Sequence, residues 1–368
     1  MNKKKVLFLS AANSIHTIRW VNALSKKFEV HLVYCKNHKP NLDAVNSKVI
    51  MHELSVPAPL GYYLNAFQLR KLFHIIKPNI VNAHYASGYG TLARIAKIKP
   101  LLLSIWGSDV YDFPNESTLK KKILEKNIFY ADEIASTSIS MAKELKRQFP
   151  NLKKEIFITP FGVDTNKFKN MHIEREDKDF NIGNIKALEE KYGIEYLILG
   201  VEELLNNLKN KDSSLASKIK LYIYGDGSQR EYLENLITSH NLNNNVFLMG
   251  KIPNNEVPNK LNEFDVFCAS SILNSESFGV AVVEAMACEV PVIATDTDGF
   301  CEVMVNGETG YLVEKKNIKE LASGLKKFFD DRELAKKLGK NGRNRVLKNY
   351  SWDKNVKYME EIYNKISK

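Results

Sequence analysis

Cysteine is scarce in this chain, and its placement excludes several classes of site. Only four cysteines occur in the 368 residues, far apart in the sequence: Cys35, Cys268, Cys288 and Cys301. None stands in a Cys-x-x-Cys pair or at a spacing typical of metal ligands, so we expect reduced thiols. No apolar run approaches the roughly 18 residues that cross a bilayer. Asn13 soon interrupts the apolar run that follows the lysines at 3–5, which favours a buried strand over a signal peptide.

Glycine is missing from the first expected turn between a strand and a helix. Residues 10–16 read Ser-Ala-Ala-Asn-Ser-Ile-His, whereas a dinucleotide-binding turn needs glycines so that a pyrophosphate can approach the backbone. A nicotinamide or flavin dehydrogenase is therefore disfavoured. The chain also has no short-period repeat, no low-complexity tract and no Asp-x-Asp motif in a context that suits a metal ion.

The overall composition is that of a globular protein, with 44% hydrophobic and 26% charged residues. A chain of this length favours two domains of about 150–200 residues each. The formal net charge of +10 favours anionic partners, such as nucleic acid, an acidic membrane surface or phosphorylated substrates. A generally lysine-rich composition is the alternative explanation of this charge.

Short β-rich runs alternate with amphipathic segments along both halves of the chain. In the first half we expect strands at 6–10, 29–34, 80–83 and 101–105 and helices at 17–27, 67–76 and 90–96. In the second half we expect strands at 219–224, 246–249, 266–269, 292–294 and 310–313 and helices at 194–208, 229–240 and 278–287. This alternation predicts an α/β fold of two Rossmann-like, doubly wound domains, joined by a linker at 161–179. Ligands of such folds bind at the carboxyl ends of the strands, so we expect the site in a cleft between the domains.

Two glutamates eight positions apart, Glu276 and Glu284, are the sharpest functional signal. Ser277 is expected to cap a helix that begins near Phe278, and Gly279 lets backbone amides approach an anion at the positive end of that helix. One carboxylate suits ribose hydroxyls and the other suits sugar hydroxyls. Eight residues of helix rise about 12 Å, more than the roughly 5–9.5 Å between the carboxylates of a glycosidase. The structural alternative is two solvated glutamates around a core helix.

The motifs around this pair follow a characteristic order. Tyr-Gly-Asp-Gly at 224–227 and Val-Phe-Leu-Met-Gly at 246–250 precede it, and Ala-Met-Ala-Cys-Glu-Val-Pro at 285–291 and Asn-Gly-Glu-Thr-Gly at 306–310 follow it. This order resembles the carboxyl domain of the family 4 glycosyltransferases (glycosyl transferases group 1), which have the GT-B fold of two Rossmann-like domains facing a central cleft. The resemblance covers nearly the whole chain. It implies sugar transfer from a nucleoside-diphosphate donor with retention, as in polysaccharide and lipopolysaccharide biosynthesis.

The resemblance also implies roles for residues of the carboxyl half. Lys186 takes the place of the family's arginine and Lys191 matches its lysine; both would hold the leaving diphosphate, so that no metal is required. Glu276, Lys191 and Lys186 are therefore the expected catalytic residues. The expected donor-binding residues are Glu284, Phe278, Gly279, Val280, Gly225, Asp226, Gly250 and Lys251. Because lysine lacks the bidentate fork of arginine, we expect a looser grip on the diphosphate.

In the amino half, residues 81–85 and 103–110 resemble the two strand-end segments that face the cleft in the family. The expected acceptor-side residues are Asn13, His16, Arg19, His84, Trp106, Ser108 and Asp109. Many members have a histidine where this chain has Trp106, so an imidazole role is in doubt there. The indole either stacks on a sugar face or belongs to the core. His84 is likewise either a cleft residue or a structural histidine.

Other departures from the family's pattern are Asp298, where a glycine pair is common, and Glu289, where a glycine usually precedes Val-Pro. Residues 350–352 and the last helical segment resemble the tail that returns to the amino domain. The expected domains are therefore 1–163 on the acceptor side, 164–350 for the donor, and 351–368 as the returning helix.

Residues 117–154 combine positive charge with apolar side chains. They contain nine basic residues against four acidic ones, with Leu124, Ile128, Phe129, Leu145 and Phe149 between them. A basic amphipathic helix is typical of surface attachment to anionic lipid, and an ordinary solvated face is the alternative. We expect peripheral attachment at this stretch and a lipid-linked acceptor.

The expected protein is thus a cytoplasmic hexosyl-type glycosyltransferase, in solution or on the inner face of the membrane, that uses a UDP- or GDP-sugar and no cofactor. The alternatives are another GT-B enzyme, such as a sugar-nucleotide epimerase or a phosphorylase, and a non-catalytic partner subunit that keeps the fold. Nucleic acid is not an expected partner, because no basic motif interleaved with aromatics occurs beyond 117–154.

Overall fold

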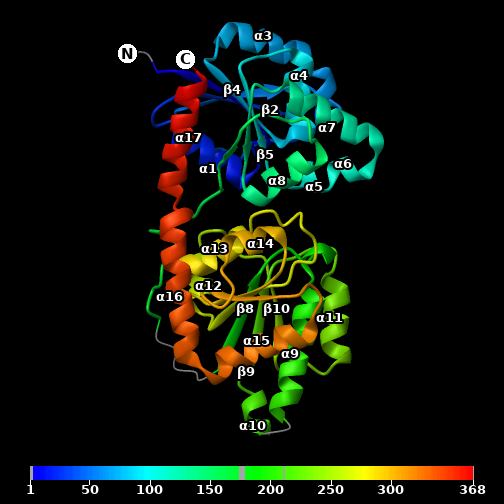
Figure 1. The fold of residues 1–368 in the computed structure, drawn as a ribbon, viewed down its shortest axis with the longest axis vertical. Helices are drawn as coiled ribbons and strands as arrows, with labels where there is room; N and C mark the ends of the chain where they lie inside the picture. The colour runs from blue at the N-terminus through cyan, green and yellow to red at the C-terminus, as the bar shows by residue number, and fades with distance from the viewer. Residues whose placement is uncertain (1–2, 174–178, 210–211, 368) are drawn as a thin grey trace. The chain divides into compact units, whose positions relative to one another are not determined.

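The computed structural model describes residues 3–173, 179–209 and 212–367. The chain divides into two compact units, residues 1–161 with 353–368 and residues 162–352. Each unit is a parallel sheet with helices packed on its two faces (Figure 1). The predicted class, an α/β fold of two Rossmann-like units, is confirmed. No helix within the described residues is long and apolar enough to cross a membrane.

The sheet of the first unit has seven strands in the order β3-β2-β1-β4-β5-β6-β7. The strands are β1 (Lys5–Leu9), β2 (Glu29–Cys35), β3 (Val49–Leu54), β4 (Ile80–His84), β5 (Leu101–Ile105), β6 (Glu133–Ser136) and β7 (Ile156–Ile158). The apolar residues of β1 are buried on both faces, as expected for a central strand of a parallel sheet. Leu7 of β1 pairs with His31 of β2 on one side and with Val81 of β4 on the other.

The helices of the first unit lie in two layers. They are α1 (Ile15–Leu24), α2 (Gly61–Leu64), α3 (Ala66–Ile76), α4 (Gly90–Ala96), α5 (Ser108–Tyr111), α6 (Phe113–Glu116), α7 (Thr118–Tyr130), α8 (Ile139–Gln148) and α17 (Trp352–Ile366), with the short turns η1 (Leu42–Ala44) and η2 (Tyr85–Tyr89). Helix α4 packs against α2, α3 and α7 on the face of the sheet that carries Leu7. On the opposite face, Tyr363 of α17 packs near Phe8 and accepts a 2.7 Å hydrogen bond from the Nδ2 of Asn82.

The sheet of the second unit has six strands in the order β10-β9-β8-β11-β12-β13. The strands are β8 (Phe180–Ile185), β9 (Ile219–Tyr224), β10 (Val246–Gly250), β11 (Val266–Ala269), β12 (Val292–Thr295) and β13 (Gly310–Val313). The helices are α9 (Ile194–Lys209), α10 (Ser213–Ala216), α11 (Arg230–Ser239), α12 (Val257–Asn262), α13 (Val280–Ala287), α14 (Asp298–Val303), α15 (Ile318–Asp330) and α16 (Arg332–Asn349), with the turn η3 (Glu190–Tyr192). Helices α9 and α15 pack together over the core that contains Leu197, Leu321 and Phe328.

Four strands were not predicted from the sequence. Strand β3 lies at the edge of its sheet, and β6 and β7 are short. Strand β8 is central, but Asn181, Gly183 and Asn184 interrupt the apolar run by which a central strand is recognised in a sequence. The last of these positions proves to line the candidate site.

In both sheets the strand order reverses beside the first strand, between β1 and β4 and between β8 and β11. Connections leave such a switch point on opposite faces, which opens a crevice at the carboxyl ends of the two strands. The residues that follow β8 and β11, and those that follow β1 and β4, are therefore best placed to meet a ligand.

Candidate active site

A narrow hollow lies at the switch point of the second sheet. Asn184 and Lys186 reach it from the end of β8, Ser270 from the loop after β11, and Glu276 and Gly279 from the segment that leads into α13. Residues nearly a hundred positions apart thus share one hollow, because the parallel strands place their carboxyl ends side by side.

Lys186 and Glu276 form an ion pair in this hollow. The Nζ of Lys186 lies 2.5 Å from the Oε2 of Glu276, and the two side chains are only 26% and 11% exposed. Burial opposes the charge on Lys186, but attraction to Glu276, Tyr192 and Glu284 outweighs it, so the pKa of Lys186 lies above its usual range. The hollow is therefore lined by a cation, Lys186, and its carboxylate partner Glu276, with Glu284 close enough to act on the lysine.

Tyr192 gathers the two lysines of the motif around one aromatic ring. Its ring centroid is 4.4 Å from the Nζ of Lys186 and 5.1 Å from the Nζ of Lys191. Both distances are within the range of cation–π attraction. Lys191 is exposed, and Lys186 is half-buried. Two ammonium groups near one ring have the charge that suits an anion with two charged groups, such as a diphosphate.

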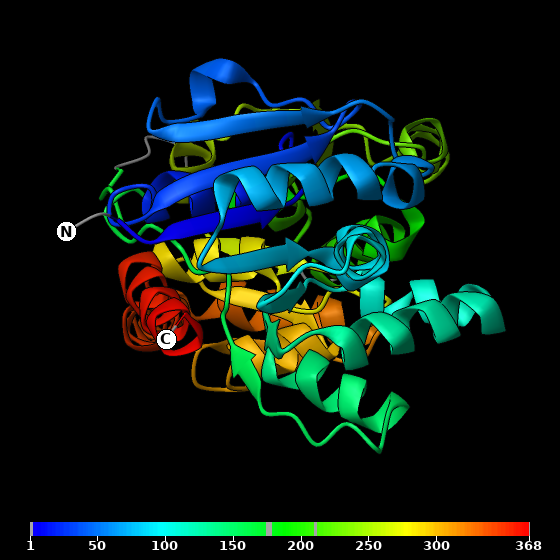
Figure 2. The ribbon, with the colours of Figure 1, turned by 90° about the horizontal axis from the view of Figure 1, so that it is seen from above.

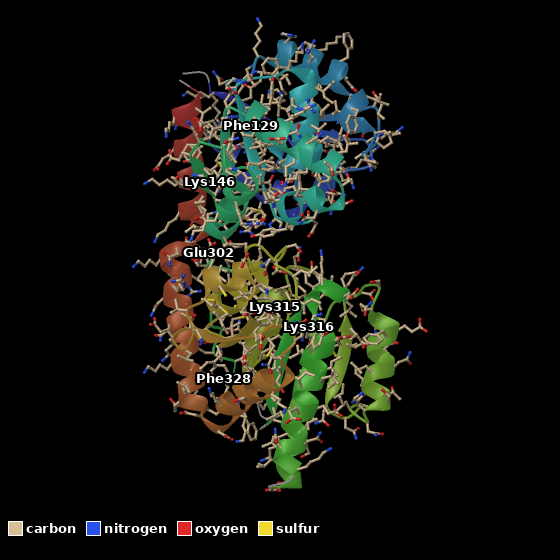
Figure 3. All side chains as sticks on the ribbon, turned by 45° about the vertical axis from the view of Figure 1, so that its right-hand side comes forward. Phe129, Lys146, Glu302, Lys315, Lys316 and Phe328 are labelled. Atoms are coloured by element: carbon tan, nitrogen blue, oxygen red, sulfur yellow. The ribbon has the colours of Figure 1, made fainter. Side chains whose placement is uncertain are left out.

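The loop that carries Glu276 is fastened to its neighbours. The backbone N–H of Ile272 donates to the carbonyl of Lys191 (2.9 Å), and the hydroxyl of Ser270 donates to the carbonyl of Tyr192 (3.0 Å). Farther along the loop, the Nζ of Lys315 donates to the Oδ1 of Asn274 (2.9 Å); Lys315 is labelled on the second unit in Figure 3. The first two bonds connect the segment that carries Lys186 and Lys191 to the loop that carries Glu276, and they fix the positions of the two relative to each other.

Helix α13 begins two residues later than the sequence suggests. It starts at Val280, and its N-cap is Gly279 in the left-handed conformation (φ 79°). The prediction that Ser277 caps a helix near Phe278 is therefore wrong, because the chain needs this left-handed turn before it can enter the helix. A Cβ on Gly279 would lie 2.7 Å from the ring of Phe300. Glycine is required here both by the backbone angle and by the close approach.

Other donor-side predictions fall on the same segment. Glu276 stays in the loop before α13, and Glu284 lies within α13, half-buried and close enough to raise the pKa of Lys186. Phe278 is buried, 5.6 Å from Tyr350 between ring centroids. Only the backbone of Phe278 is therefore available to a ligand, whereas Val280 is half-buried at the first position of α13.

A second and wider hollow, of about 220 Å³, adjoins Lys186. It is lined by the ends of β9 and β10 with the segment that follows, including Gly225, Asp226 and Lys251. The backbone N–H of Gly225 donates to the carbonyl of Gly250 (2.8 Å). A Cβ on Gly225 would lie 1.9 Å from the carbonyl oxygen of Lys186. Glycine at 225 therefore lets the two loops touch, and it joins this hollow to the one that holds the ion pair.

In the first unit, the predicted residues meet in an aromatic cluster at the ends of β1, β4 and β5. The ring of His84 lies 4.3 Å from that of Trp106, which lies 5.2 Å from Phe161. His16 stacks on Phe161 at 4.0 Å, and Tyr85 meets Trp106 edge-on at 5.1 Å. Trp106 is 8% exposed. The indole is thus packed within the cluster rather than open as a stacking platform.

His84 is buried and neutral in this cluster. Burial, reinforced by His16, lowers the pKa of His84 to about 3. Its Nδ1 lies 3.0 Å from the hydroxyl of Ser10, which in turn lies 2.7 Å from that of Thr17. His84 therefore joins the end of β4 to the first turn, and it carries no charge at neutral pH.

Asp109 holds the loop of Trp106 from inside. Its carboxylate accepts backbone N–H groups of Trp106 (3.0 Å), Gly107 (2.9 Å) and Ala86 (2.8 Å). The side chain is 1% exposed, so it positions the strand-end loops and does not face a ligand. Of the other acceptor-side predictions, Asn13 and Ser108 are exposed, and Arg19 is half-buried.

Comparison with known proteins identifies the class of enzyme. The family model for glycosyl transferases group 1 matches residues 166–345, and that for glycosyl transferase 4-like proteins matches residues 5–138. The chain belongs to the group 1 glycosyltransferases. It is 28% identical over 366 residues to an uncharacterised glycosyltransferase of Methanocaldococcus jannaschii, covering 96% of this chain and 94% of the relative.

Two further likenesses cover nearly all of this glycosyltransferase. The capsular polysaccharide biosynthesis glycosyltransferase CapM of Staphylococcus aureus is 26% identical over 387 residues, covering 99% of this chain and 97% of the relative. HepE of Anabaena, solved in complex with UDP-glucose, superposes with a TM-score of 0.76 at 17% identity and covers 98% of this chain and 99% of that one. The fold is therefore GT-B, as predicted.

The glycosyltransferase has site residues that the sequence analysis missed. Tyr192 stands beside Lys191 in the predicted motif, and this adjacency was the available signal. Asn184 lines the ion-pair hollow, is 2% exposed and donates to the carbonyl of Cys268 (2.8 Å), while its Oδ1 has no hydrogen-bond partner among the described residues. A buried strand that carries such an amide at its carboxyl end is a signal for a polar ligand.

The basic stretch at 117–154 differs from its predicted character. The segments expected to be amphipathic are the helices α7 and α8, with β6 between them. Of the five apolar residues named above, Leu124, Ile128, Leu145 and Phe149 are buried in the core and cannot face lipid, whereas Phe129 is 42% exposed. Lys154 donates to the carbonyls at the end of α7, among them that of Phe129 (3.1 Å), and acts as a cap.

Proposed function

We propose that this glycosyltransferase moves a hexose-type sugar from a UDP- or GDP-sugar to a glycan or lipid-linked acceptor, with retention, in the synthesis of a bacterial surface polysaccharide or glycoconjugate. The observation that carries the donor assignment is the arrangement of Lys186 and Lys191 around Tyr192 beside Glu276. The capsular polysaccharide enzyme among its relatives supports the acceptor class, and the UDP-glucose complex of HepE supports the donor class.

Each part of the donor meets a suitable group in the second unit. Lys186 and Lys191 are assigned to the diphosphate, which needs two cations. Glu276, which lines the hollow, is assigned to the hydroxyls of the sugar, and Glu284 to those of the ribose. The 220 Å³ hollow lined by Gly225, Asp226 and Lys251 is assigned to the base. Asn184 adds an amide oxygen that can accept a hydrogen bond from a hydroxyl of the ligand.

The chemistry assigned to these residues is stabilisation of a leaving group. The bond from the anomeric carbon to the β-phosphate oxygen breaks, and its electron pair leaves with the nucleoside diphosphate. The acceptor hydroxyl forms the new bond on the same face, and its proton passes to the departing phosphate oxygen. Lys186 and Lys191 stabilise the negative charge that develops on the diphosphate. Glu276 and Glu284 hold the donor in the reacting position.

Neutral groups of the first unit are assigned to the acceptor side. His84 is uncharged at neutral pH, since burial lowers its pKa to about 3. His16 and Tyr85 are the half-buried members of the aromatic cluster, so they rather than Trp106 are placed to touch a sugar. Asp109 is assigned a positioning role beneath them.

The proposal is tested by incubating the purified protein with a panel of nucleoside-diphosphate sugars and following release of the nucleoside diphosphate. We expect Lys191→Ala to lower kcat/KM by about 100-fold, as for loss of one charge-stabilising group, and Glu284→Ala by about 10–100-fold. Lys319→Ala and Glu231→Ala, which change exposed residues of α15 and α11, are the matched controls. Unchanged donor turnover in both site variants contradicts the assignment.

The same assay separates the related chemistries. Transfer releases a nucleoside diphosphate and joins the sugar to an acceptor, whereas an epimerase forms an isomer of the donor without acceptor and a phosphorylase requires inorganic phosphate. Retention is read from the proton coupling constant at the anomeric carbon of the product. A product with the opposite anomeric configuration to the donor refutes it.

A further inference from the structure

Helices α2 and α3 of the first unit leave large apolar side chains in solvent. Leu60 (65% exposed), Tyr63 (47%), Leu64 (65%), Phe67 (83%) and Ile75 (67%) all lie on this segment. Isolated exposed apolar residues are ordinary, but a contiguous group of them marks an interaction surface. Figure 2 shows α3 unobscured by any other part of the first unit.

These side chains recur at helical spacing along one face. Leu60, Leu64, Phe67 and Ile75 fall on the positions i, i+4, i+7 and i+15, with Lys71 at i+11. Leu69 and Ile76 point the other way, into the core. The outer side of α3 thus exposes Phe67 and Ile75 among Arg70, Lys71 and His74, while its inner side packs into the core of the described residues. We call Leu60, Tyr63, Leu64, Phe67, Lys71 and Ile75 the α2–α3 face.

The charge around the α2–α3 face is of one sign. No aspartate or glutamate occurs between Glu53 and Asp109, whereas Lys71 and Lys77 are exposed beside the apolar residues. Glu53 itself is paired with Lys39 at 3.2 Å. Helix α4 packs between α3 and α7, and α7 exposes Lys121, Lys122 and Lys126 together with Glu125.

An apolar ridge rimmed by lysines fits an anionic lipid surface. Apolar side chains can enter the boundary between headgroups and acyl chains, while lysines contact lipid phosphates. A second copy of this chain fits less well, because a two-fold contact buries the same patch of both copies, and this patch brings lysines from each side without an acidic residue to pair with them. The net charge of +10 also opposes self-association through this face.

We propose that the α2–α3 face docks this protein on an anionic membrane, with Leu64 and Phe67 entering the headgroup region and Lys71 and Lys77 meeting lipid phosphates. The docking surface is thus assigned to α2 and α3, where five large apolar side chains are exposed within sixteen positions; within 117–154, Leu124, Ile128, Leu145 and Phe149 are buried, and the exposed Leu119, Phe129 and Ile139 are ten positions apart. The inference stands on the exposure and charge of this face, so it holds or fails independently of the donor assigned above.

The test is flotation of the full chain with vesicles of phosphatidylcholine alone or mixed with phosphatidylglycerol. We expect binding to the anionic vesicles that weakens with salt, and at least about tenfold weaker binding for Leu64→Ser with Phe67→Ser. Leu42→Ser is the matched control, because Leu42 is as exposed as Leu64 and lies on η1. Lys71→Gln with Lys77→Gln is expected to reduce only the part of the binding that depends on anionic lipid.

Three outcomes overturn the proposal: equal flotation of the Leu64/Phe67 variant and the parent, binding lost only when Lys121, Lys122 and Lys126 are changed to glutamine, or no preference for anionic lipid. Sedimentation of a dimer that the Leu64/Phe67 variant no longer forms also overturns it, since the face would then bind a second copy. Thermal unfolding of each variant is compared with the parent, because loss of exposed side chains should leave Tm within about 2 °C.

Discussion

Exchange of Glu276 for glutamine should strengthen binding of a nucleoside diphosphate while it weakens recognition of the sugar. In the structure the Oε2 of Glu276 forms an ion pair with the Nζ of Lys186 at 2.5 Å. A diphosphate must therefore compete with this carboxylate for the same ammonium group. Two unit charges about 4 Å apart attract by about 4 kcal/mol at an effective dielectric constant of 20. The two side chains remain 26% and 11% exposed, and water screens part of this. Without this carboxylate, a diphosphate no longer competes for Lys186, and we expect its binding free energy to improve by about 1–2 kcal/mol. This corresponds to about 5–30-fold tighter binding of UDP.

The assay is calorimetric titration of UDP, UMP and a UDP-sugar into the parent, Glu276→Gln, Lys186→Met and the double variant. Glu276→Gln should bind UDP more tightly, with a smaller change for UMP, which has no β-phosphate. The advantage of the UDP-sugar over UDP should fall in the same variant, because a carboxylate contact to the sugar is lost. Lys186→Met should weaken the binding of UDP. In the double variant, Glu276→Gln should no longer raise the affinity for UDP.

The protonation state of the pair does not confuse this measurement. The pKa of Lys186 is raised in the folded chain, chiefly because Glu276 outweighs the cost of burial. Stabilisation by a group of raised pKa is complete below the pKa of the unfolded lysine and is lost only as the pH rises through the folded value. Titrations between pH 7 and about 9 therefore sample one charge state. If Glu276→Gln weakens the binding of UDP as strongly as Lys186→Met does, then Glu276 helps Lys186 to bind the diphosphate instead of competing with the diphosphate for Lys186. That result would refute the reasoning.

Substitutions at three further positions test the geometry. Tyr192→Leu should weaken UDP by about 3–10-fold whereas Tyr192→Phe should not, because the aromatic face holds the two ammonium groups; equal effects in a titration would contradict this. Gly279→Ala should lower the free energy of unfolding by at least about 1 kcal/mol and abolish donor binding, since its φ is +79° and Phe300 lies 2.7 Å from the added Cβ; denaturant unfolding that matches the parent would refute it. Burial and His16 lower the pKa of His84 to about 3, so the unfolded chain binds the proton first and stability should fall by up to about 1.4 kcal/mol per pH unit below pH 6.5. His84→Asn should flatten that slope in unfolding measured from pH 4 to 7, and an unchanged slope assigns it to other groups.

The donor half was largely predictable because its strands are local, strongly apolar runs. The expected strands at 219–224, 266–269 and 310–313 coincide with β9, β11 and β13. Strand β8 was missed because function replaces apolar residues there: Asn184 faces the hollow, and Gly183 makes room for Phe264, whose ring would lie 2.0 Å from an added Cβ. Local reasoning fails where the site departs from ordinary strand composition.

The contacts within the site could not be read from spacing alone. The 186–191 and 276–284 motifs indicated a diphosphate and two hydroxyl-bearing groups, but the ion pair of Lys186 with Glu276 joins residues that only the switch point brings together. The left-handed turn at Gly279 likewise depends on the tight approach of Phe300 from α14. The ion pair and the left-handed turn both result from tertiary packing. In a single sequence the only sign of the turn is the glycine itself.

The proposed membrane-docking surface also could not be identified from the sequence alone. In the sequence, 117–154 and 60–77 are both basic segments with apolar residues at helical spacing, and periodicity alone cannot say which apolar residues meet the core. Helix α7 turns Leu124 and Ile128 inward and, of its large apolar residues, exposes only Leu119 and Phe129, ten positions apart near its two ends. Helix α3 buries Leu69 and still exposes Phe67, because its apolar residues exceed what one inner face can hold. Surplus apolar area beside lysines, and not positive charge alone, is therefore the feature that separates a docking helix from a solvated one.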